Sequence, residues 1–491
     1  MSEDNSYSRI FKGIAVFGGV QFIQILVRIV RGKLASILIG AKGMGLTSIY
    51  TSSVGLIVST AGLGMSSSGV RDISEATTIK DINERNEKIT VINQCFYLTY
   101  ILGFFLCLAL SPLLSYTTFG DFSHTLTYCL LSFYVVFEIC NSHHIVILQG
   151  MGLIKKLASA TITITISTLV LAVAFYYFFG LDGIIPVMIL GSLIGAAVRY
   201  NQVRKLKIPF KWHPIKKVLK ESKTMISIGS VSLMSLIMNS LMIYVLNIFL
   251  SRFGTIETVG YFNAANSIII QSVSMIFAAM SADYYPRLAK IANNREETNM
   301  AVNRQTEVLC YIAIPILGIM IIASSLIIYL LLSSEFLVIT NFTKWVALAT
   351  AFQVYSYPLG HVIWAKGDIK VLFYLNGLYT STSRLIVYII GFYLGGLEGL
   401  GYGMCAINAF NCILYSILLK KRYGYERDAT AKRNILYLLP LFIVVLLTIQ
   451  DNPYLFSLSI IIMIVVSVDC FKRLDSKLYL VQNIKHRIRK Q

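Results

Sequence analysis

The tetrapeptide GLDG at residues 180–183 recurs as GLEG at residues 396–399. The two copies are 216 residues apart, and they match in the type of side chain as well as in hydropathy. Further equivalences at an offset of 215 residues join Gly152 to Gly367 and Gly45 to Gly260. A chain that matches itself at a nearly fixed offset is built from two similar parts. The repeat therefore predicts two related halves, followed by an extension beyond about residue 425 that has no counterpart.

The composition places both halves in a membrane. The chain has 491 residues, of which 56% are hydrophobic and only 14% are charged, which is far from the balance of a soluble globular protein. Apolar runs of about 20 residues, long enough to cross a bilayer as helices, recur along nearly the whole sequence. We expect an all-α polytopic membrane protein with about fourteen transmembrane helices, one of them near residues 45–66, with ends placed to within roughly 2 to 4 residues.

The duplication divides these spans into lobes. We expect an N-terminal six-helix lobe in residues 1–215 and a C-terminal six-helix lobe in residues 216–424. Residues 425–491 would form an extra transmembrane hairpin and a basic cytoplasmic tail. Six is an even number, so the two repeats are parallel and should be related by an axis along the membrane normal. Two such lobes facing a central cavity are suited to transport by alternating access.

The distribution of lysine and arginine predicts the orientation. Residues 199–223 contain nine of them and residues 420–433 contain six, whereas alternate connections contain none: 111–123, 180–183, 395–399 and 450–453. Positively charged short loops stay in the cytoplasm, so both termini should be cytoplasmic. The net charge of +19 is then largely a signal of topology. Basic runs interleaved with aromatic residues, as in a base-stacking surface, are not found in the sequence, so we expect no nucleic-acid partner.

The stretch VRIVRGK at residues 27–33 breaks this charge pattern. At 100° per residue, Gln24, Arg28 and Arg31 lie on one stripe of a helix, while Lys33 points elsewhere. One interpretation is that these cations extend to the outer interface. The other is that they face a hydrated cavity, where two guanidiniums one turn apart would grip phosphate oxygens. The second interpretation predicts substrate-binding roles for Gln24, Arg28 and Arg31 and an anionic ligand.

Other polar residues lie within apolar spans and are candidates for the same cavity. Arg384 is too deep to reach an interface easily and is a further candidate for substrate binding. Candidate cavity-lining residues, grouped by helical spacing, are Asn263 and Asn266, Ser48 and Thr51, and Asn376. For hydroxyl and amide side chains, hydrogen bonding between helices is the more common role in membranes, and this alternative stays open.

Glu138 lies near the middle of its predicted span and is a candidate for carrying a coupling proton. The alternative is a carboxyl group that is neutral or paired inside the bundle. The eight cysteines occur singly, without metal-ligand spacing, and the sequence contains no nucleophile motif or phosphate-binding glycine loop. We therefore expect no metal, no cofactor and no enzymatic activity.

Three motifs resemble a known family when taken in order. They are RGKLASILIGAKGMGLTSIY (31–50), YYPRLAKI (284–291), and LLLSSEF (330–336) followed by WAKGDIKVLFYLNGLY (364–379). Together they look like signatures of the O-antigen translocases in the multidrug/oligosaccharidyl-lipid/polysaccharide exporter superfamily. The resemblance covers roughly residues 10–420. Many O-antigen translocases have twelve spans, whereas the fourteen expected here are typical of the related lipid II flippases.

The resemblance implies a flippase in the bacterial inner membrane. Its substrate would be an undecaprenyl-diphosphate-linked oligosaccharide, an O-antigen or related repeat unit for a surface polysaccharide such as lipopolysaccharide, moved from the cytoplasmic to the periplasmic leaflet. Membrane lipids and polysaccharide polymerase machinery are the other partners implied. The lipid II flippases carry arginines in the first span that line a central cavity, and Arg31, nine residues before Gly40, falls where one of them would.

Two rival functions remain at this point. A cation-coupled multidrug exporter of the same superfamily would share the architecture, although a cationic cavity argues against it. A membrane enzyme of polysaccharide assembly would be expected to present a sizeable external loop, and none of the predicted external connections exceeds about 15 residues.

Overall fold

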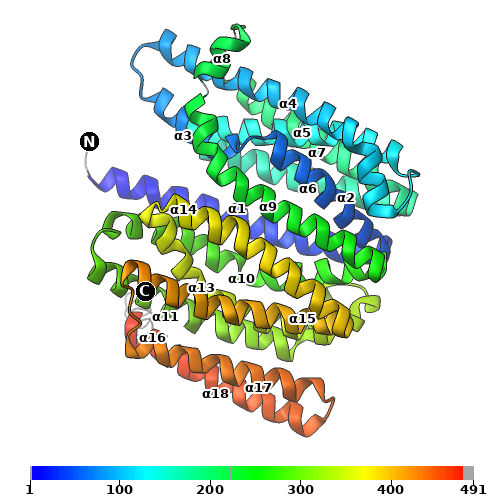
Figure 1. The fold of residues 1–491 in the computed structure, drawn as a ribbon, viewed down its shortest axis with the longest axis vertical. Coiled ribbons are helices and arrows are strands. Elements are labelled where there is room, and N and C mark those ends of the chain that lie inside the picture. Colours follow the sequence, from blue (N-terminus) through cyan, green and yellow to red (C-terminus); the bar gives the residue numbers. More distant parts are fainter. Residues whose placement is uncertain (1–2, 209–210, 222, 479–491) are drawn as a thin grey trace, which may run out of the picture. The chain divides into compact units, whose positions relative to one another are not determined.

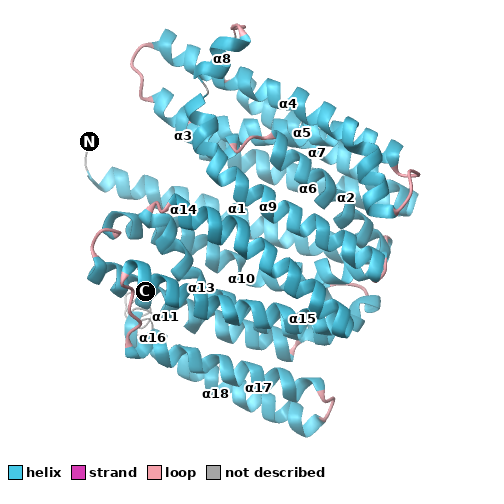
Figure 2. Ribbon diagram, in the orientation of Figure 1, coloured by secondary structure: helices cyan, strands magenta, loops and turns pink. Residues whose placement is uncertain are grey.

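The computed structural model describes residues 3–208, 211–221 and 223–478, and this part of the chain is helical with no strand assigned (Figures 1 and 2). The predicted all-α membrane fold is confirmed. Nine segments among the described residues are long and apolar enough to cross a membrane. Two of these, Ile154–Arg204 and Leu372–Tyr423, have 51 and 52 residues and each contain two helices. The total of fourteen spans stays a prediction.

Contacts between Cα atoms divide the chain into two compact units. The first unit comprises Met1–Gly260, Leu331–Ser333 and Leu375–Thr382, and the second comprises the remainder. The helices of the first unit are α1 (Glu3–Leu38), α2 (Gly40–Ala61), α3 (Met65–Thr77), α4 (Ile82–Phe119), α5 (Thr125–Gly150), α6 (Ile154–Phe179), the 3₁₀ turn η1 (Gly180–Gly183), α7 (Ile184–Arg204), α8 (Ile215–Glu221) and α9 (Lys223–Phe253).

The core of the first unit forms where apolar faces of its long helices meet. Helix α5 packs between α4 and α7, α1 packs against α6, and α9 packs against α2. The main apolar cluster of this unit includes the fully buried residues Val54, Tyr128, Leu131 and Val135. Burying such side chains is the main stabilising term once the helices are formed.

A helix break separates α2 from α3, within the last five residues of the span predicted near residues 45–66. Gly62 ends the first helix, Leu63 has φ 49° and Gly64 has φ 68°. A left-handed conformation at two successive residues cannot continue a right-handed helix. The apolar run continues across this point, so hydropathy alone did not reveal the break.

The repeated tetrapeptides have the same local structure. Gly180 has φ 54° and ψ −125°, and Gly396 has φ 57° and ψ −140°. Only glycine adopts this region readily. At Gly180 the turn joins α6 to α7, and at Gly396 it kinks α15 (Thr380–Tyr423) into two helices. The sequence duplication therefore corresponds to a duplicated turn.

The second unit contains most of α10 and most of the helices that follow it, although Leu375–Thr382, at the end of η3 and the start of α15, belongs to the first unit. These helices are α10 (Ile256–Ile291), α11 (Arg295–Ile322), α12 (Ser324–Leu331), η2 (Ser334–Ile339), α13 (Thr340–Lys366), α14 (Ile369–Val371), the π-helical η3 (Leu372–Tyr379), α15, α16 (Ala429–Asn434), η4 (Ile435–Tyr437), α17 (Leu438–Ile449) and α18 (Pro453–Leu478). Helices α17 and α18 form an antiparallel hairpin against α11, and α17 also contacts α13. The predicted appended hairpin is thus present, while the end of the basic tail, residues 479–491, lies outside the described residues.

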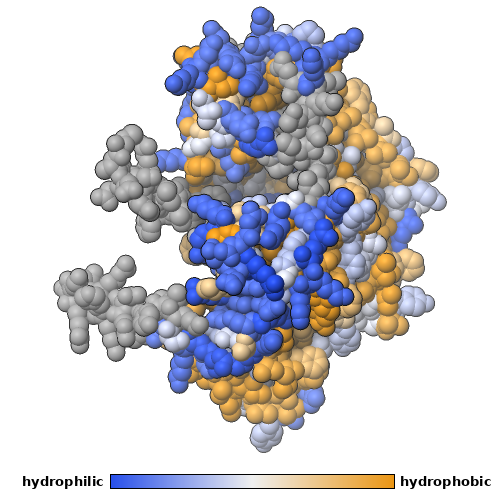
Figure 3. All heavy atoms as spheres, turned by 60° about the vertical axis from the view of Figure 1, so that its left-hand side comes forward, coloured by the Kyte–Doolittle hydropathy of each residue, from blue (hydrophilic) through white to orange (hydrophobic). Residues whose placement is uncertain are grey.

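The surface separates polar from apolar residues. Figure 3 shows hydrophilic residues gathered on one face and hydrophobic residues on the sides. Large apolar side chains of α17 and α18 are among those exposed, including Leu439, Ile461 and Val465. Such exposed apolar surface is expected where helices face lipid rather than water.

Candidate functional site

The predicted cationic stripe lies on the second half of α1. Arg28 and Arg31 are exposed and Gln24 is half-buried. Within the described part of the chain, no hydrogen bond or ion pair is recorded for any of the three. Lys33 lies on another face, as predicted, and donates to the carbonyl oxygen of Leu332. The stripe therefore presents two guanidiniums that are not neutralised by a carboxylate of their own unit.

The electrostatic influence of Arg31 extends into the core of the first unit. The Tyr134 phenol, on α5, interacts with the charge of Arg31 and also with that of Glu138. Tyr134 is half-buried and packs against the main apolar cluster. Tyr134 therefore lies within the electrostatic range of both Arg31 on α1 and Glu138 on α5, a relation that spacing within a single helix cannot reveal.

Glu138 belongs to a polar cluster between α5 and α7. Asn141 donates from Nδ2 to Glu138 Oε1 at 3.3 Å and accepts at Oδ1 from Arg199 Nη1 at 2.8 Å. The charges of Glu138 and Arg199 attract each other. Gly195 permits this approach, because a Cβ atom there would lie 2.9 Å from the Asn141 amide. The sequence left a paired carboxyl open as an alternative, and the structure supplies the partners; the coupling role of Glu138 stays a prediction.

Two histidines continue the cluster toward the other end of α5. His144 interacts with Arg199 and lies 3.6 Å from the Cys140 sulfur. His143 Nε2 lies 2.9 Å from Asn93 Oδ1 on α4, and its other ring nitrogen contacts the Tyr100 hydroxyl. These buried polar groups satisfy one another, as buried groups in a stable core must.

The polar residues of α2 are engaged with α9. Asn247 Nδ2 donates to Ser52 Oγ at 3.0 Å and to the carbonyl oxygen of Ser48 at 3.4 Å. Ser48 Oγ itself donates within α2, to the carbonyl oxygen of Met44 at 2.9 Å. The Ser48 hydroxyl thus bonds within its own helix, only its backbone carbonyl oxygen accepts from α9, and Thr51 is exposed. Their lining of a cavity stays a prediction.

Helix α9 carries a polar stripe that the sequence analysis missed. Ser240 Oγ lies 3.0 Å from Ser59 Oγ on α2, and the Tyr244 hydroxyl lies 2.7 Å from Thr117 Oγ1 on α4. Together with Asn247 these residues follow the i, i+4, i+7 spacing of one helix face. The sequence therefore contains the spacing that puts these three residues on one face of α9. The spacing does not identify the helix against which this face packs.

The remaining candidates lie on later helices. Asn266 donates from Nδ2 to the Phe262 carbonyl oxygen at 2.8 Å, Asn263 is half-buried, and Asn376 is half-buried within the π-helical turn η3. Arg384 is half-buried, and its Nε atom is buried without a hydrogen-bond partner in the described structure. Since Arg384 belongs to the second unit and the α1 stripe to the first, their joint action stays a prediction. The described residues include no cluster of three metal-ligating side chains.

Comparisons with known proteins agree with this architecture. A family model described as "Polysaccharide biosynthesis protein" matches residues 57–341. An "Uncharacterized membrane protein in cps region" from Klebsiella pneumoniae is 25% identical over 177 residues. That match spans about a third of the relative and a third of this chain, 34% in each case.

Solved structures share the fold at low sequence identity. An inward-facing multidrug resistance MATE family transporter of the MOP superfamily is similar with a TM-score of 0.67 and 16% identity, over 82% of this chain and 94% of that one. The lipid II flippase MurJ in an inward closed conformation is similar with a TM-score of 0.66 and 16% identity, over 96% and 100%. These structures show the fold of a multi-pass membrane protein, and the family model agrees with the predicted relationship to polysaccharide export.

Proposed function

Because the chain belongs to the polysaccharide biosynthesis protein family, we propose that it flips an undecaprenyl-diphosphate-linked oligosaccharide from the cytoplasmic to the periplasmic leaflet. The oligosaccharide would be an O-antigen or a related surface polysaccharide repeat unit. The proposal includes a location in the bacterial inner membrane with both termini cytoplasmic. We further propose that the protein is a transporter without enzymatic activity. It would deliver the repeat unit to polysaccharide polymerase machinery on the outer side of the membrane.

The observation that carries the proposal is the exposed pair Arg28 and Arg31 on α1. Arginine is always charged and presents donors in a planar fork that fits phosphate oxygens. An ionisable side chain within a membrane span usually faces a hydrated cavity or a partner, and no carboxylate is recorded against either guanidinium in the described structure. The diphosphate of the lipid carrier is a ligand with the complementary charge.

The proposed mechanism keeps the lipid tail in hydrocarbon while the diphosphate and sugars cross through water. Arg28 and Arg31, with Gln24 and Arg384, would hold the diphosphate, and the polar residues Ser48, Thr51, Asn263, Asn266 and Asn376 would line the path of the sugars. Movement of the lobes would then expose the head group to the other side. Glu138 is the candidate for coupling this movement to a proton.

The sidedness of the lipid-linked intermediate in a deletion strain tests the proposed activity. We expect a complete repeat unit to accumulate facing the cytoplasm, protected from an added glycosidase in intact spheroplasts, and surface polysaccharide to be lost. An unchanged lipid-linked profile together with new sensitivity to toxic cations would contradict the proposal and favour the multidrug exporter.

Substitution of Arg31 tests the residue on which the proposal depends. We expect Arg31→Ala to reduce export about 10- to 100-fold, the effect of losing hydrogen bonds to a charged ligand. Arg31→Lys should recover only part of this loss, because an ammonium group keeps the charge but lacks the fork. Surface polysaccharide is measured at equal amounts of folded membrane protein.

Lys42→Ala is the matched control for Arg31→Ala. Lys42 is also an exposed cation, two residues into α2, so its removal changes the net charge by the same amount. We expect export to stay near the wild-type level. Equal losses of export in the two variants would show that export depends on the net positive charge of the protein and not on the position of Arg31 in the α1 stripe.

A further inference from the structure

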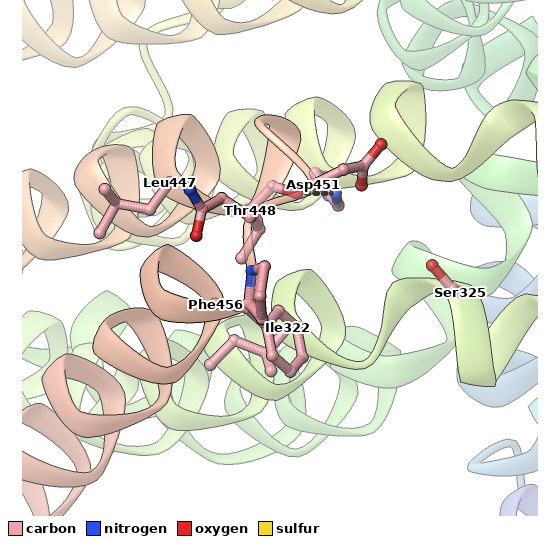
Figure 4. Close-up of a pocket in the computed structure, with 9 residues that line it drawn as sticks. Ile322, Ser325, Leu447, Thr448, Asp451 and Phe456 are labelled. Carbon is pink, nitrogen blue, oxygen red and sulfur yellow. Dashed lines mark hydrogen bonds between the residues drawn. The ribbon is translucent and has the colours of Figure 1, made fainter.

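A cavity of about 270 Å³ lies in the second unit, where the appended hairpin meets the helices of the lobe. Its lining comes from the end of α11, the start of α12, α13, and both helices of the hairpin with the turn between them (Figure 4). The residues that matter here are Ile322, Ser325, Lys344, Leu447, Asp451 and Phe456. The substrate path proposed above uses none of these residues.

The cavity contains a cation at its base. Lys344 is only 5% exposed, yet it lines the cavity. Its Nζ atom donates to the Thr448 carbonyl oxygen at 2.8 Å and to Asn341 Oδ1 at 3.2 Å. An ammonium group has three N–H donors, so one remains for a ligand in the cavity. A buried lysine held in this way is a built site for an acceptor oxygen.

An anion stands at the rim of the same cavity. Asp451 is exposed in the hairpin turn, with φ 47°, and it interacts electrostatically with Lys344. Figure 4 shows the Asp451 carboxylate pointing toward the side on which Ser325 lies. The site thus offers one positive and one negative group to a ligand.

The two charges lie at different depths. Lys344 is buried, whereas Asp451 is exposed in the turn that follows the end of α17 at Ile449. The turn has no lysine or arginine between residues 450 and 453, whereas residues 420–433 at the other end of the hairpin have six, so the positive-inside pattern puts the turn outside. The cation therefore lies nearer the hydrocarbon and the anion nearer the external water.

Apolar side chains complete the wall. Ile322, Leu447 and Phe456 line the cavity, and Phe456 is 42% exposed. Leu326, which follows the lining residue Ser325 in the chain, is 58% exposed. Exposed apolar surface of this kind at the end of a membrane hairpin faces acyl chains.

We propose that this cavity binds the head group of a zwitterionic amino-phospholipid, such as phosphatidylethanolamine, in the outer leaflet. The phosphate would accept from Lys344, the ammonium group would contact the Asp451 carboxylate, and the acyl chains would lie along Phe456 and Leu326. Lys344 lies nearer the hydrocarbon than Asp451 does. In such a lipid the phosphate likewise lies nearer the acyl chains than the ammonium group does, so each lipid charge meets a protein charge of opposite sign. The bound lipid would fix the appended hairpin against α11 and α13.

The charges make other occupants poorer ligands. A diphosphate carries several negative charges and would face both Asp451 and Glu398, which also interacts with Lys344. Glu398 is itself held by Asn341 Nδ2 at 3.2 Å and by the Tyr402 hydroxyl at 3.3 Å. An anionic phospholipid such as phosphatidylglycerol would satisfy Lys344 but lacks an ammonium group for Asp451.

Lipid retention by the purified full-length protein tests the site. Wild-type protein is equilibrated with equal amounts of phosphatidylethanolamine and phosphatidylglycerol, and bound lipids are counted by native mass spectrometry. We expect a preference of about threefold for phosphatidylethanolamine, the size of one exposed ion pair. Asp451→Asn should abolish the preference, and Ser325→Phe, which fills the cavity from an exposed position, should reduce retention of both lipids.

Asp182→Asn is the matched control, because Asp182 is an exposed aspartate at another predicted external turn. We expect it to keep the wild-type preference. Equal retention of the two lipids by the wild-type protein would overturn the proposal. So would an Asp182→Asn effect as large as that of Asp451→Asn, or unchanged retention in a folded Ser325→Phe variant. All of these outcomes are independent of export, so they leave the proposed flippase activity to its own test.

Discussion

Glu138 and Arg199 lie on neighbouring helices and share Asn141, which donates to one and accepts from the other. Removing one charge from such a cluster leaves the other without compensation in an interior of low polarity. The Nε atom of Arg199 is already buried without a hydrogen-bond partner in the described structure. This guanidinium therefore has a hydrogen bond to Asn141 and a compensating charge in Glu138.

We expect Glu138→Ala to destabilise the first unit by about 1.5–3 kcal/mol, the usual range for a lost hydrogen bond that involves a charged group. The measurement is the thermal unfolding midpoint of the purified protein in detergent. Replacing Arg199 by Met in the same variant should recover part of the loss, because no buried charge is then left unpaired. Additive losses in the double variant would show that the two residues are not coupled.

The sequence predicted which face of its helix a residue lies on, but it did not predict which residue of another helix that face contacts. Helical spacing placed Gln24, Arg28 and Arg31 on one face of α1, and the structure shows both arginines exposed there. The same spacing gave no means of pairing Glu138 with Arg199, which is 61 positions away. Periodicity determines the direction of a side chain from its own helix, but the neighbour depends on how helices pack.

At the scale of elements, two equivalent glycines bring the start of α2 and the start of α10 together. A Cβ atom on Gly45 would lie 2.0 Å from the Ile256 carbonyl oxygen, and one on Gly260 would lie 2.2 Å from the Ala41 carbonyl oxygen. The contact is reciprocal, as expected for equivalent positions that face each other. Small residues commonly permit such close approach of helices in membranes.

We expect Gly45→Ala to lower stability by about 1–3 kcal/mol, because a backbone oxygen would have to move to admit the methyl group. Gly55→Ala is the matched control on the same helix. A Cβ atom on Gly55 meets nothing within 4 Å, so that substitution should be neutral or stabilising by up to about 1 kcal/mol through helix propensity. Thermal midpoints of the two variants in one detergent give the comparison, and similar midpoints would contradict the close contact.

The elements were predictable to different degrees. Apolar length gave the helices, and the recurrence of GLDG as GLEG gave two turns that have the same conformation at Gly180 and Gly396. The break after Ala61 was not predictable from hydropathy, since Leu63 continues the apolar run through it. Glycines at 62 and 64 were visible, but glycine inside an apolar span also serves close packing, as Gly45 does.

At the scale of the whole molecule, accessibility to a thiol reagent tests the proposed orientation in the membrane. Single cysteines at Asp182 and Asn452 should react with an impermeant maleimide in intact spheroplasts, because these exposed positions lie in connections without cations. Cysteines at Lys80 and Lys420 should react only after permeabilisation. The wild-type protein measures the background, since its eight cysteines are buried or half-buried. The opposite labelling pattern would reverse the proposed topology.

The hydrogen bonds between the polar stripe of α9 and helix α2 have a consequence for the synthesis of the protein. The first unit extends to Gly260, beyond the predicted end of the first repeat at residue 215, and α9 supplies partners for Ser52 and Ser59 of α2. A nascent chain that has completed only the first repeat would leave this hydroxyl-bearing face facing lipid. At about 5–20 residues per second, the ribosome needs several more seconds to deliver α9, and during that interval the membrane insertion machinery would have to shelter an unfinished bundle.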